Sequence, residues 1–244
     1  MSTAPLFLLD PLPGVGPARL DGAEGRHAAT VKRLRPGESV LLSDGCGGLA
    51  QAVVDAAGRD SVDLTVTGRA DAAPPVPRVL LAQALVKGDR GELAVELATE
   101  AGATGSCRGA RPAASRWEEG PRGEKALARW RSTVREATKQ ARRPWLPVVE
   151  EPVTTAALAR RAAAADLALV LHEAGAERLT DVSLPASGDL LLVVGPEGGI
   201  TDAELDTLVA AGARPVRLGP EVLRASTAAA VALGALGVLT PRWG

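Results

Sequence analysis

The sequence is poor in aromatic and sulfur-containing residues. It has no Tyr, one Phe, two Cys and two His among 244 residues. Stacking platforms for nucleic acid bases are therefore not expected, and these Cys and His are too few for a zinc cluster or a disulfide framework. We predict no metal site. The apolar content is 46%, mostly Ala, Val and Leu, and predicts an aliphatic core.

Long apolar runs are also absent. The longest, residues 228–239, is shorter than the roughly 18 to 20 residues that span a bilayer. The apolar residues 5–9 lack the basic flank and the small-residue cleavage site of a secretion signal. These absences predict a cytoplasmic protein without a membrane segment.

Neither positive nor negative charge is in excess, because the formal net charge is only −1. That balance argues against a nucleic acid partner, but the charges are unevenly distributed. Residues 108–143 contain eleven Lys or Arg and four Glu. A concentrated basic segment on a neutral chain is typical of a surface that binds a polyanion. The alternative is a solvated helix face with paired charges.

The chain has two kinds of local pattern, which predict two domains. Residues 1–72 contain short strands that end at turn residues, as in a small β-barrel or sandwich. A Pro-rich stretch at residues 70–78 marks the boundary. Residues 73–244 alternate apolar strands with helices, which predicts an α/β domain with a mostly parallel sheet. Its expected strands are 79–85, 167–173, 190–195 and 215–219, and its expected helices are 91–102, 125–142, 155–165, 202–211 and 226–239.

Three predicted strands continue into loops rich in glycine or polar residues: 169–175, 193–200 and 216–227. Parallel strands bind ligands beyond their carboxyl ends, so these loops predict one pocket. The second loop is the sharpest signal, because Gly195, Gly198 and Gly199 let a ligand approach the main chain closely. Thr201 and Glu204 then form a capping-box pattern that begins a helix.

A glycine turn before a helix often binds phosphate. Here neither the Walker nor the dinucleotide-binding spacing is present. Glu197, in the middle of the turn, would also repel a phosphate. The turn therefore favours a cationic ligand or one with hydroxyl and amine groups. A plain strand-to-helix turn is the alternative.

The segments "VVGPEGGITDAEL" and "RLGPEVLRASTAAAVAL" closely resemble the paired signature of the ribosomal RNA small subunit methyltransferase E family. Members of this family are uridine-N3 methyltransferases of the SPOUT superfamily. Residues 26–45, 87–102 and 123–147 also look like family segments. The resemblance thus covers nearly the whole chain.

This resemblance implies a PUA-like β-barrel followed by a trefoil-knotted α/β domain, and a homodimer. The substrate would be small-subunit ribosomal RNA, either free or in the assembled subunit. In the family, the three loops hold S-adenosyl methionine. The cofactor-binding residues implied here are Leu171, His172, Gly195, Glu197, Gly198, Gly199, Leu218, Gly219, Val222, Leu223, Arg224 and Thr227.

Two residues are candidates for catalysis. Arg224 would stabilise the uridine anion that forms when N3 loses its proton, or it would only clamp a loop carbonyl. Glu197 would hold the cofactor or accept the proton, or it would simply be a carboxylate favoured by the helix dipole. Neither glycine loop contains a histidine, so a histidine base is not expected.

The residues expected to contact RNA phosphates are Arg33, Arg35, Lys87, Arg90, Arg129, Arg135 and Arg143. Trp130 and Trp145 could stack on a base, although aromatic residues in such positions usually belong to the core. Two alternative functions are also compatible with the sequence. One is an RNA-binding module without catalytic turnover, and the other is a methyltransferase of a different RNA.

The sequence departs from the family at a few positions. Ala225 and Ser226 replace the usual Thr-Glu, and Ala141 stands where Ser is common. Residues 102–117 show no strand pattern, although the family has an apolar strand there. A short frame-shifted patch in the gene would explain this segment, because a neighbouring frame of GC-rich codons can encode an apolar strand. We therefore assign no function to Cys107 or Arg116.

Overall fold

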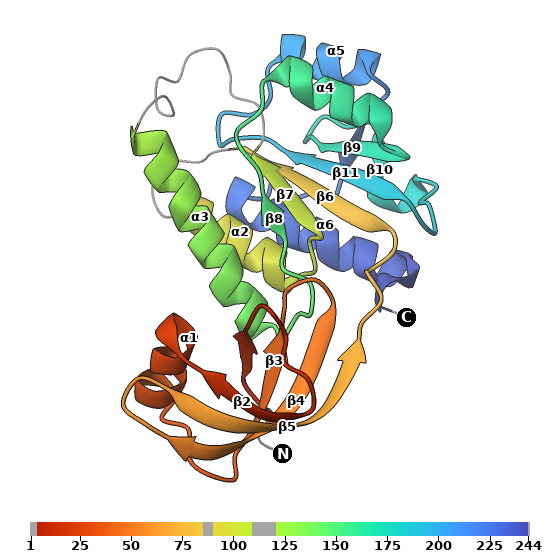
Figure 1. Ribbon diagram of the computed structural model, residues 1–244. Coiled ribbons are helices and arrows are strands. Elements are labelled where there is room, and N and C mark those ends of the chain that lie inside the picture. Colours follow the sequence, from red (N-terminus) through yellow and green to blue (C-terminus); the bar gives the residue numbers. More distant parts are fainter. Residues whose placement is uncertain (1–3, 85–89, 109–120, 244) are drawn as a thin grey trace. The chain divides into compact units, whose positions relative to one another are not determined.

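The computed structural model describes residues 4–84, 90–108 and 121–243 (Figure 1). The chain forms two compact units. The first consists of residues 1–74 together with residues 138–146, and the second of residues 75–137 and 147–244. The sequence pattern predicts a boundary after residue 72 but contains no sign that residues 138–146 join the first unit.

The first unit is built on a five-stranded sheet in the order β1-β3-β4-β5-β2. Only β1 and β3 are parallel. One face packs an aliphatic core around Phe7, Leu20, Leu42 and Leu64. The short strands expected in residues 1–72 are confirmed, and the described residues of this range contain five of them. The strands are β1 (Leu6–Leu8), β2 (Gly16–Leu20), β3 (Ser39–Ser43), β4 (Gly48–Ala57) and β5 (Val62–Asp71).

Two short helical segments follow β2 in this unit: α1 (Gly22–Arg26) and the π-helix η1 (His27–Val31). A buried ion pair joins α1 to residues 138–146, because Lys139 Nζ lies 3.3 Å from Glu24 Oε1. The Trp145 indole donates a hydrogen bond to the Ala72 carbonyl at 3.1 Å. Trp145 therefore has a structural role within the first unit.

The second unit contains a parallel seven-stranded sheet in the order β10-β12-β9-β11-β6-β7-β8. The four strands predicted in this domain are confirmed as β6, β9, β11 and β12, with ends shifted by one or a few residues. The strands are β6 (Arg78–Gln83), β7 (Gly105–Arg108), β8 (Val148–Val149), β9 (Leu167–Leu171), β10 (Glu177–Arg178), β11 (Asp189–Val194) and β12 (Arg214–Arg217).

Helices cover both faces of this sheet (Figure 1). As a result, both faces of strand β11 are buried. Leu190 and Leu192 pack with α6 on one face, and Leu191 and Val193 pack with α4 and α5 on the other. The continuous apolar run is thus explained by burial on two faces. The helices of this domain are α2 (Arg90–Glu100), α3 (Pro121–Gln140), α4 (Thr155–Ala164), α5 (Asp202–Ala210) and α6 (Ala225–Leu239). Trp130, on α3, is only 2% exposed, which makes it a core residue.

Residues 102–117 show no strand pattern in the sequence, yet part of this segment is a strand in the structure. Residues Gly105–Arg108 form β7, which pairs in parallel with β6 on one side and β8 on the other. The main chain supplies these hydrogen bonds, so neighbouring strands can impose a strand on a sequence with little strand pattern of its own. Arg116 lies outside the described residues.

Candidate active site

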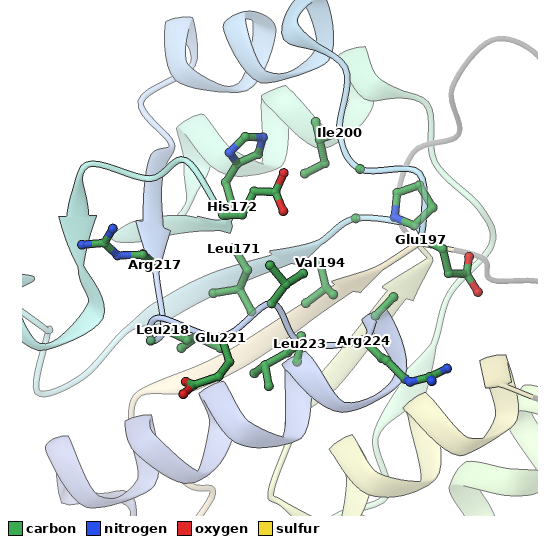
Figure 2. A pocket seen from close by; sticks show the side chains of 18 of the residues that line it. Leu171, His172, Val194, Glu197, Ile200, Arg217, Leu218, Glu221, Leu223 and Arg224 are labelled. Carbon is green, nitrogen blue, oxygen red and sulfur yellow. The ribbon is translucent and has the colours of Figure 1, made fainter.

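A pocket of about 750 Å³ lies at the carboxyl ends of β9, β11 and β12 (Figure 2). Leu171 pairs with both Val194 and Val216, so the three strands end at the same level. The three loops that follow them form the walls. The sequence prediction that these loops share one pocket is confirmed.

The pocket is lined by all but one of the predicted cofactor-binding residues. The lining includes Leu171, His172, Gly195, Glu197, Gly198, Gly199, Leu218, Gly219, Val222, Leu223 and Arg224. Thr227 is not among the lining residues, because its hydroxyl donates to the Arg224 carbonyl at 3.2 Å. Thr227 therefore supports the first turn of α6 instead of facing the pocket.

Further lining residues were not predicted from the sequence. Glu173, Ile200, Arg217 and Glu221 all line the pocket. Each of them is next to a predicted residue in the same loop or strand. Their position in these loops was therefore the feature of the sequence that could have indicated them. With Arg90 and Arg224, the pocket combines acidic and basic side chains around an apolar floor.

The glycine turn has geometry that other residues would disturb. The Gly199 N–H donates to the Pro196 carbonyl at 3.0 Å, and Gly199 has a φ of +80°. A Cβ on Gly195 would lie 2.7 Å from Cγ1 of Ile200. Glycine at 195 therefore allows Ile200 to pack directly against the main chain of the turn.

Helix α5 begins immediately after this turn with the predicted capping box. The Thr201 side chain accepts from the Glu204 N–H, and the Glu204 carboxylate accepts from the Thr201 N–H. Two otherwise unpaired N–H groups at the helix end are thereby satisfied. The predicted end of the helix is also confirmed, since Gly212 follows it with a φ of +93°.

Arg224 is the N-cap residue of α6, and its carbonyl accepts from the N–H groups of Thr227 and Ala228 at 2.9 Å. These bonds fix its main chain while its side chain stays exposed. Figure 2 shows the Glu197 and Arg224 side chains on the same side of the pocket. Within the described chain, no ion pair or hydrogen bond occupies either side-chain charge.

His172 is held by its own loop. Its N–H donates to the Val216 carbonyl at 3.0 Å, and its Nδ1 accepts from the Ala174 N–H at 3.2 Å. A ring nitrogen that accepts from a main-chain N–H leaves Nε2 as the protonated nitrogen in the neutral ring. His172 is therefore a loop histidine whose Nδ1 is already engaged by the main chain, in agreement with the expectation that a histidine does not act as the base.

The residues predicted to contact RNA have different surroundings. Arg33 and Arg35 are exposed on the first unit, whereas Arg90 is the first residue of α2 and lines the pocket. Arg129 forms an ion pair with Glu92 at 3.0 Å. Lys87 lies outside the described residues.

Arg135 and Arg143 are half-buried, and both have interaction partners within the protein. In the described part of the chain, no group of three or more His, Cys, Asp or Glu could hold a metal ion. No described helix is long and apolar enough to cross a membrane.

Comparison with known proteins shows the family to which this chain belongs. Residues 73–237 match the model of an RNA methyltransferase domain, and residues 20–67 match that of an RNA methyltransferase PUA domain. The ribosomal RNA small subunit methyltransferase E of Mycobacterium tuberculosis is 51% identical over 247 residues, covering 98% of this chain and 94% of the relative. The chain belongs to the ribosomal RNA small subunit methyltransferase E family. The family member from Bacillus subtilis is 28% identical, with 91% of this chain and 90% of the relative covered.

Solved structures agree with this membership. A family member from Neisseria gonorrhoeae, bound to S-adenosyl methionine, has a TM-score of 0.83 and 26% identity, and the match covers 98% of both chains. A Legionella pneumophila methyltransferase in complex with the same cofactor has a TM-score of 0.85 and 26% identity, again over 98% of both chains.

Proposed function

We propose that the protein uses S-adenosyl methionine to methylate N3 of a uridine in small-subunit ribosomal RNA. The observation that carries the proposal is the pocket, in which a glycine turn, an apolar floor, a carboxylate and an exposed arginine meet at the ends of three parallel strands. Family membership and cofactor-bound relatives support the same conclusion.

The residues of the pocket fit S-adenosyl methionine. Leu171, Val194 and Leu218 offer an apolar surface to a flat base. At Gly198 and Gly199 no protein atom lies where a side chain would be, so main-chain groups of the turn are within reach of the ligand's hydroxyl and amine groups. Glu197 is a carboxylate suited to a positively charged ligand. The cofactor, when bound, supplies an electrophilic methyl group on a cationic sulfur.

Arg224 has the properties needed to stabilise the nucleophile. Methylation at N3 forms an N–C bond, breaks the S–C bond and releases the N3 proton. The negative charge that develops on N3 and its flanking carbonyl oxygens requires a fixed cation. Arg224 combines a main chain held by the α6 cap with an exposed guanidinium at the pocket, so its charge is available to stabilise this anion.

Glu197 has two compatible roles in this proposal. Its carboxylate could attract the cationic cofactor, or it could accept the proton from N3. The side chain is exposed at the pocket and is not engaged by another described residue. Measurements on the Glu197→Gln variant, described in the Discussion, separate the two roles.

The proposal includes a trefoil knot, a homodimer and a cytoplasmic location. The chain leaves β12 and returns to β6, where the Gln83 side chain donates to the Ala225 carbonyl at 3.3 Å. The knotted path itself rests on the resemblance to the family. On α6, Val231 and Val238 are 48% and 75% exposed, and they lie seven residues apart on one face. A second copy of this chain is the partner that we propose for that face.

Calorimetric titration and product mapping test the proposed function. We expect S-adenosyl methionine to bind with measurable heat, whereas an RNA-binding module without turnover would show none. Undermethylated small subunits incubated with protein and cofactor should gain a methyl group on uridine N3. Methylation of another base, or of another RNA only, would contradict the proposal.

A further inference from the structure

A buried glutamine lies at the carboxyl end of β6. Gln83 is the last residue of this strand, and it pairs with Val194, the last residue of β11, which lines the pocket. The side chain of Gln83 is 0% exposed. The four residues before it, 79–82, are all apolar. A polar side chain at this position therefore needs an explanation.

The two ends of the Gln83 amide have different surroundings. Nε2 donates to the carbonyl of Ala84 and to that of Ala225, each at 3.3 Å. These two carbonyls fix which end of the amide is the nitrogen, because an oxygen in that place would face two other oxygens. The Oε1 atom is buried and has no hydrogen-bond partner among the residues that the structure describes.

The unpaired oxygen makes glutamine a costly residue at this position. Burying a polar atom without a hydrogen bond lowers the stability of the fold. Methionine or leucine would fill a similar volume without such an atom. The property that glutamine adds, and that an apolar residue lacks, is the hydrogen bond from its Nε2 to Ala225.

The Ala225 carbonyl belongs to the first turn of α6, beside Arg224. Ala225 is the first residue of this helix and lines the pocket, and Arg224 is the N-cap residue before it. The bond from Gln83 thus joins the turn to a strand 142 positions away in the sequence. The Arg224 side chain has no partner within the described residues, so the place of its guanidinium depends on where this turn is held.

We propose that Gln83 is a positioning residue, which sets the place of Arg224 through the Ala225 carbonyl. The proposal rests on the function proposed above, because it requires Arg224 to stabilise the uridine anion. Such stabilisation depends on a charge that is already in place when the reaction occurs, and a misplacement of about 1 Å can lower a rate about a hundredfold. Gln83 does not line the pocket itself, so it acts through this turn.

Gln83→Met tests the proposal, because it keeps the volume of the side chain and removes the donor to Ala225. The single-turnover rate of methylation of undermethylated small subunits, at saturating cofactor, should fall about tenfold. The dissociation constant for S-adenosyl methionine should stay near that of wild type. The midpoint of urea unfolding should stay unchanged or rise, because the unpaired oxygen is removed as well. Gln83→Leu has a different shape but also lacks the donor, and it should lose the same amount of rate.

A double-mutant cycle separates positioning from a general effect on the fold. Arg224→Ala removes the side chain that Gln83 is proposed to position. Gln83→Met should therefore cause no further loss of rate in the Arg224→Ala protein. A residue that only supports the fold would lower the rate by the same factor in both backgrounds.

Thr240→Val is the matched control. The Thr240 hydroxyl donates to the Leu236 carbonyl at the opposite end of α6, and neither residue lines the pocket. This variant also removes a side-chain hydrogen bond to the main chain of α6. Its single-turnover rate should equal that of wild type.

Three results would overturn the inference. The first is a wild-type rate in both Gln83→Met and Gln83→Leu. The second is an equal loss of rate from Gln83→Met in the wild-type and Arg224→Ala backgrounds. The third is a loss of cofactor affinity or of stability as large as the loss of rate. Failure of the proposed function would be seen separately, in wild-type protein that leaves uridine N3 unmethylated or in an Arg224→Ala protein with the wild-type rate.

Discussion

At the scale of single residues, the pocket depends on how closely side chains approach the glycine turn. Ile200 occupies the space that a side chain on Gly195 would need, whereas the side chains of Glu197 and Arg224 have no described partner. The first feature determines the shape of the turn. The other two supply charge for a ligand. Substitutions at these positions should therefore affect stability and activity separately.

Gly195→Ala should destabilise the protein. The added Cβ would lie 2.7 Å from Cγ1 of Ile200, and overpacking of this kind costs about 1 to 3 kcal/mol. Gly198→Ala is the matched control, because a Cβ there meets no protein atom within 4 Å, and its effect should stay within about 0.5 kcal/mol. Urea unfolding measures both changes. Equal stability of the two variants would contradict this account of the turn.

Arg224→Ala should lower kcat by about a hundredfold or more, as expected for the loss of a group that stabilises developing charge. The affinity for S-adenosyl methionine should change little, and Arg224→Lys should recover part of the rate. Single-turnover methylation and calorimetry measure the two quantities. A loss of cofactor affinity equal to the loss of rate would instead make Arg224 a cofactor-binding residue.

Glu197→Gln removes a charge and keeps the shape of the side chain. If Glu197 holds the cationic cofactor, as we expect, the dissociation constant for S-adenosyl methionine should rise about tenfold, which corresponds to about 1.4 kcal/mol. The rate at saturating cofactor should then stay near that of wild type. A lower saturated rate with unchanged affinity would show that Glu197 accepts the proton.

At the scale of elements, α5 and β11 could be predicted from sequence because their signals are local. Thr201 and Glu204 are three residues apart on the same helix end, and the run at β11 is apolar at every position after Asp189 because both faces are covered. Strand β7 could not be predicted, since its partners β6 and β8 determine it. Arg33 and Arg142 have positive φ values of +54° and +52°, and the sequence does not reveal these either, because arginine gives no signal for a positive φ.

Thr201→Ala should lower the free energy of unfolding by about 1 kcal/mol, since it removes the capping side chain of α5. Thr207→Ala, in the same helix, is the control. The Thr207 hydroxyl donates to the Ala203 carbonyl, and alanine favours the helix, so this change should be neutral or slightly stabilising. Thermal denaturation compares the two. A cost at position 207 as large as that at 201 would contradict the role of the cap.

At the scale of the whole molecule, sequence patterns predict two domains, but they do not predict which segments of the chain belong to each domain. Residues 138–146 have helical and Pro-containing patterns like those of the second unit, yet the structure groups them with the first. The reason is tertiary. Lys139 finds its buried partner in Glu24, and Trp145 finds Ala72, both far away in the sequence. No local periodicity encodes such partners.

The proposed homodimer gives a prediction at this scale. Val238→Asp places a charge on the exposed face of α6 and should shift the protein from dimer to monomer in sedimentation equilibrium. Val15→Asp is the control, because Val15 is 72% exposed on the first unit, and it should leave the dimer intact. A monomeric wild-type protein would disprove the dimer outright.

The order of strands in the second unit has a consequence for biosynthesis. Strand β11 is central in the sheet, and its Asp189 side chain binds Arg78 of β6 across 111 positions of sequence. During translation, β6 emerges long before β11, which is one of its two neighbours in the sheet. The sheet centre therefore assembles only after about four-fifths of the chain has left the ribosome, and contacts this distant make folding slow. This member of a ribosomal RNA methyltransferase family therefore cannot complete the centre of its own sheet until a ribosome has synthesised most of the chain.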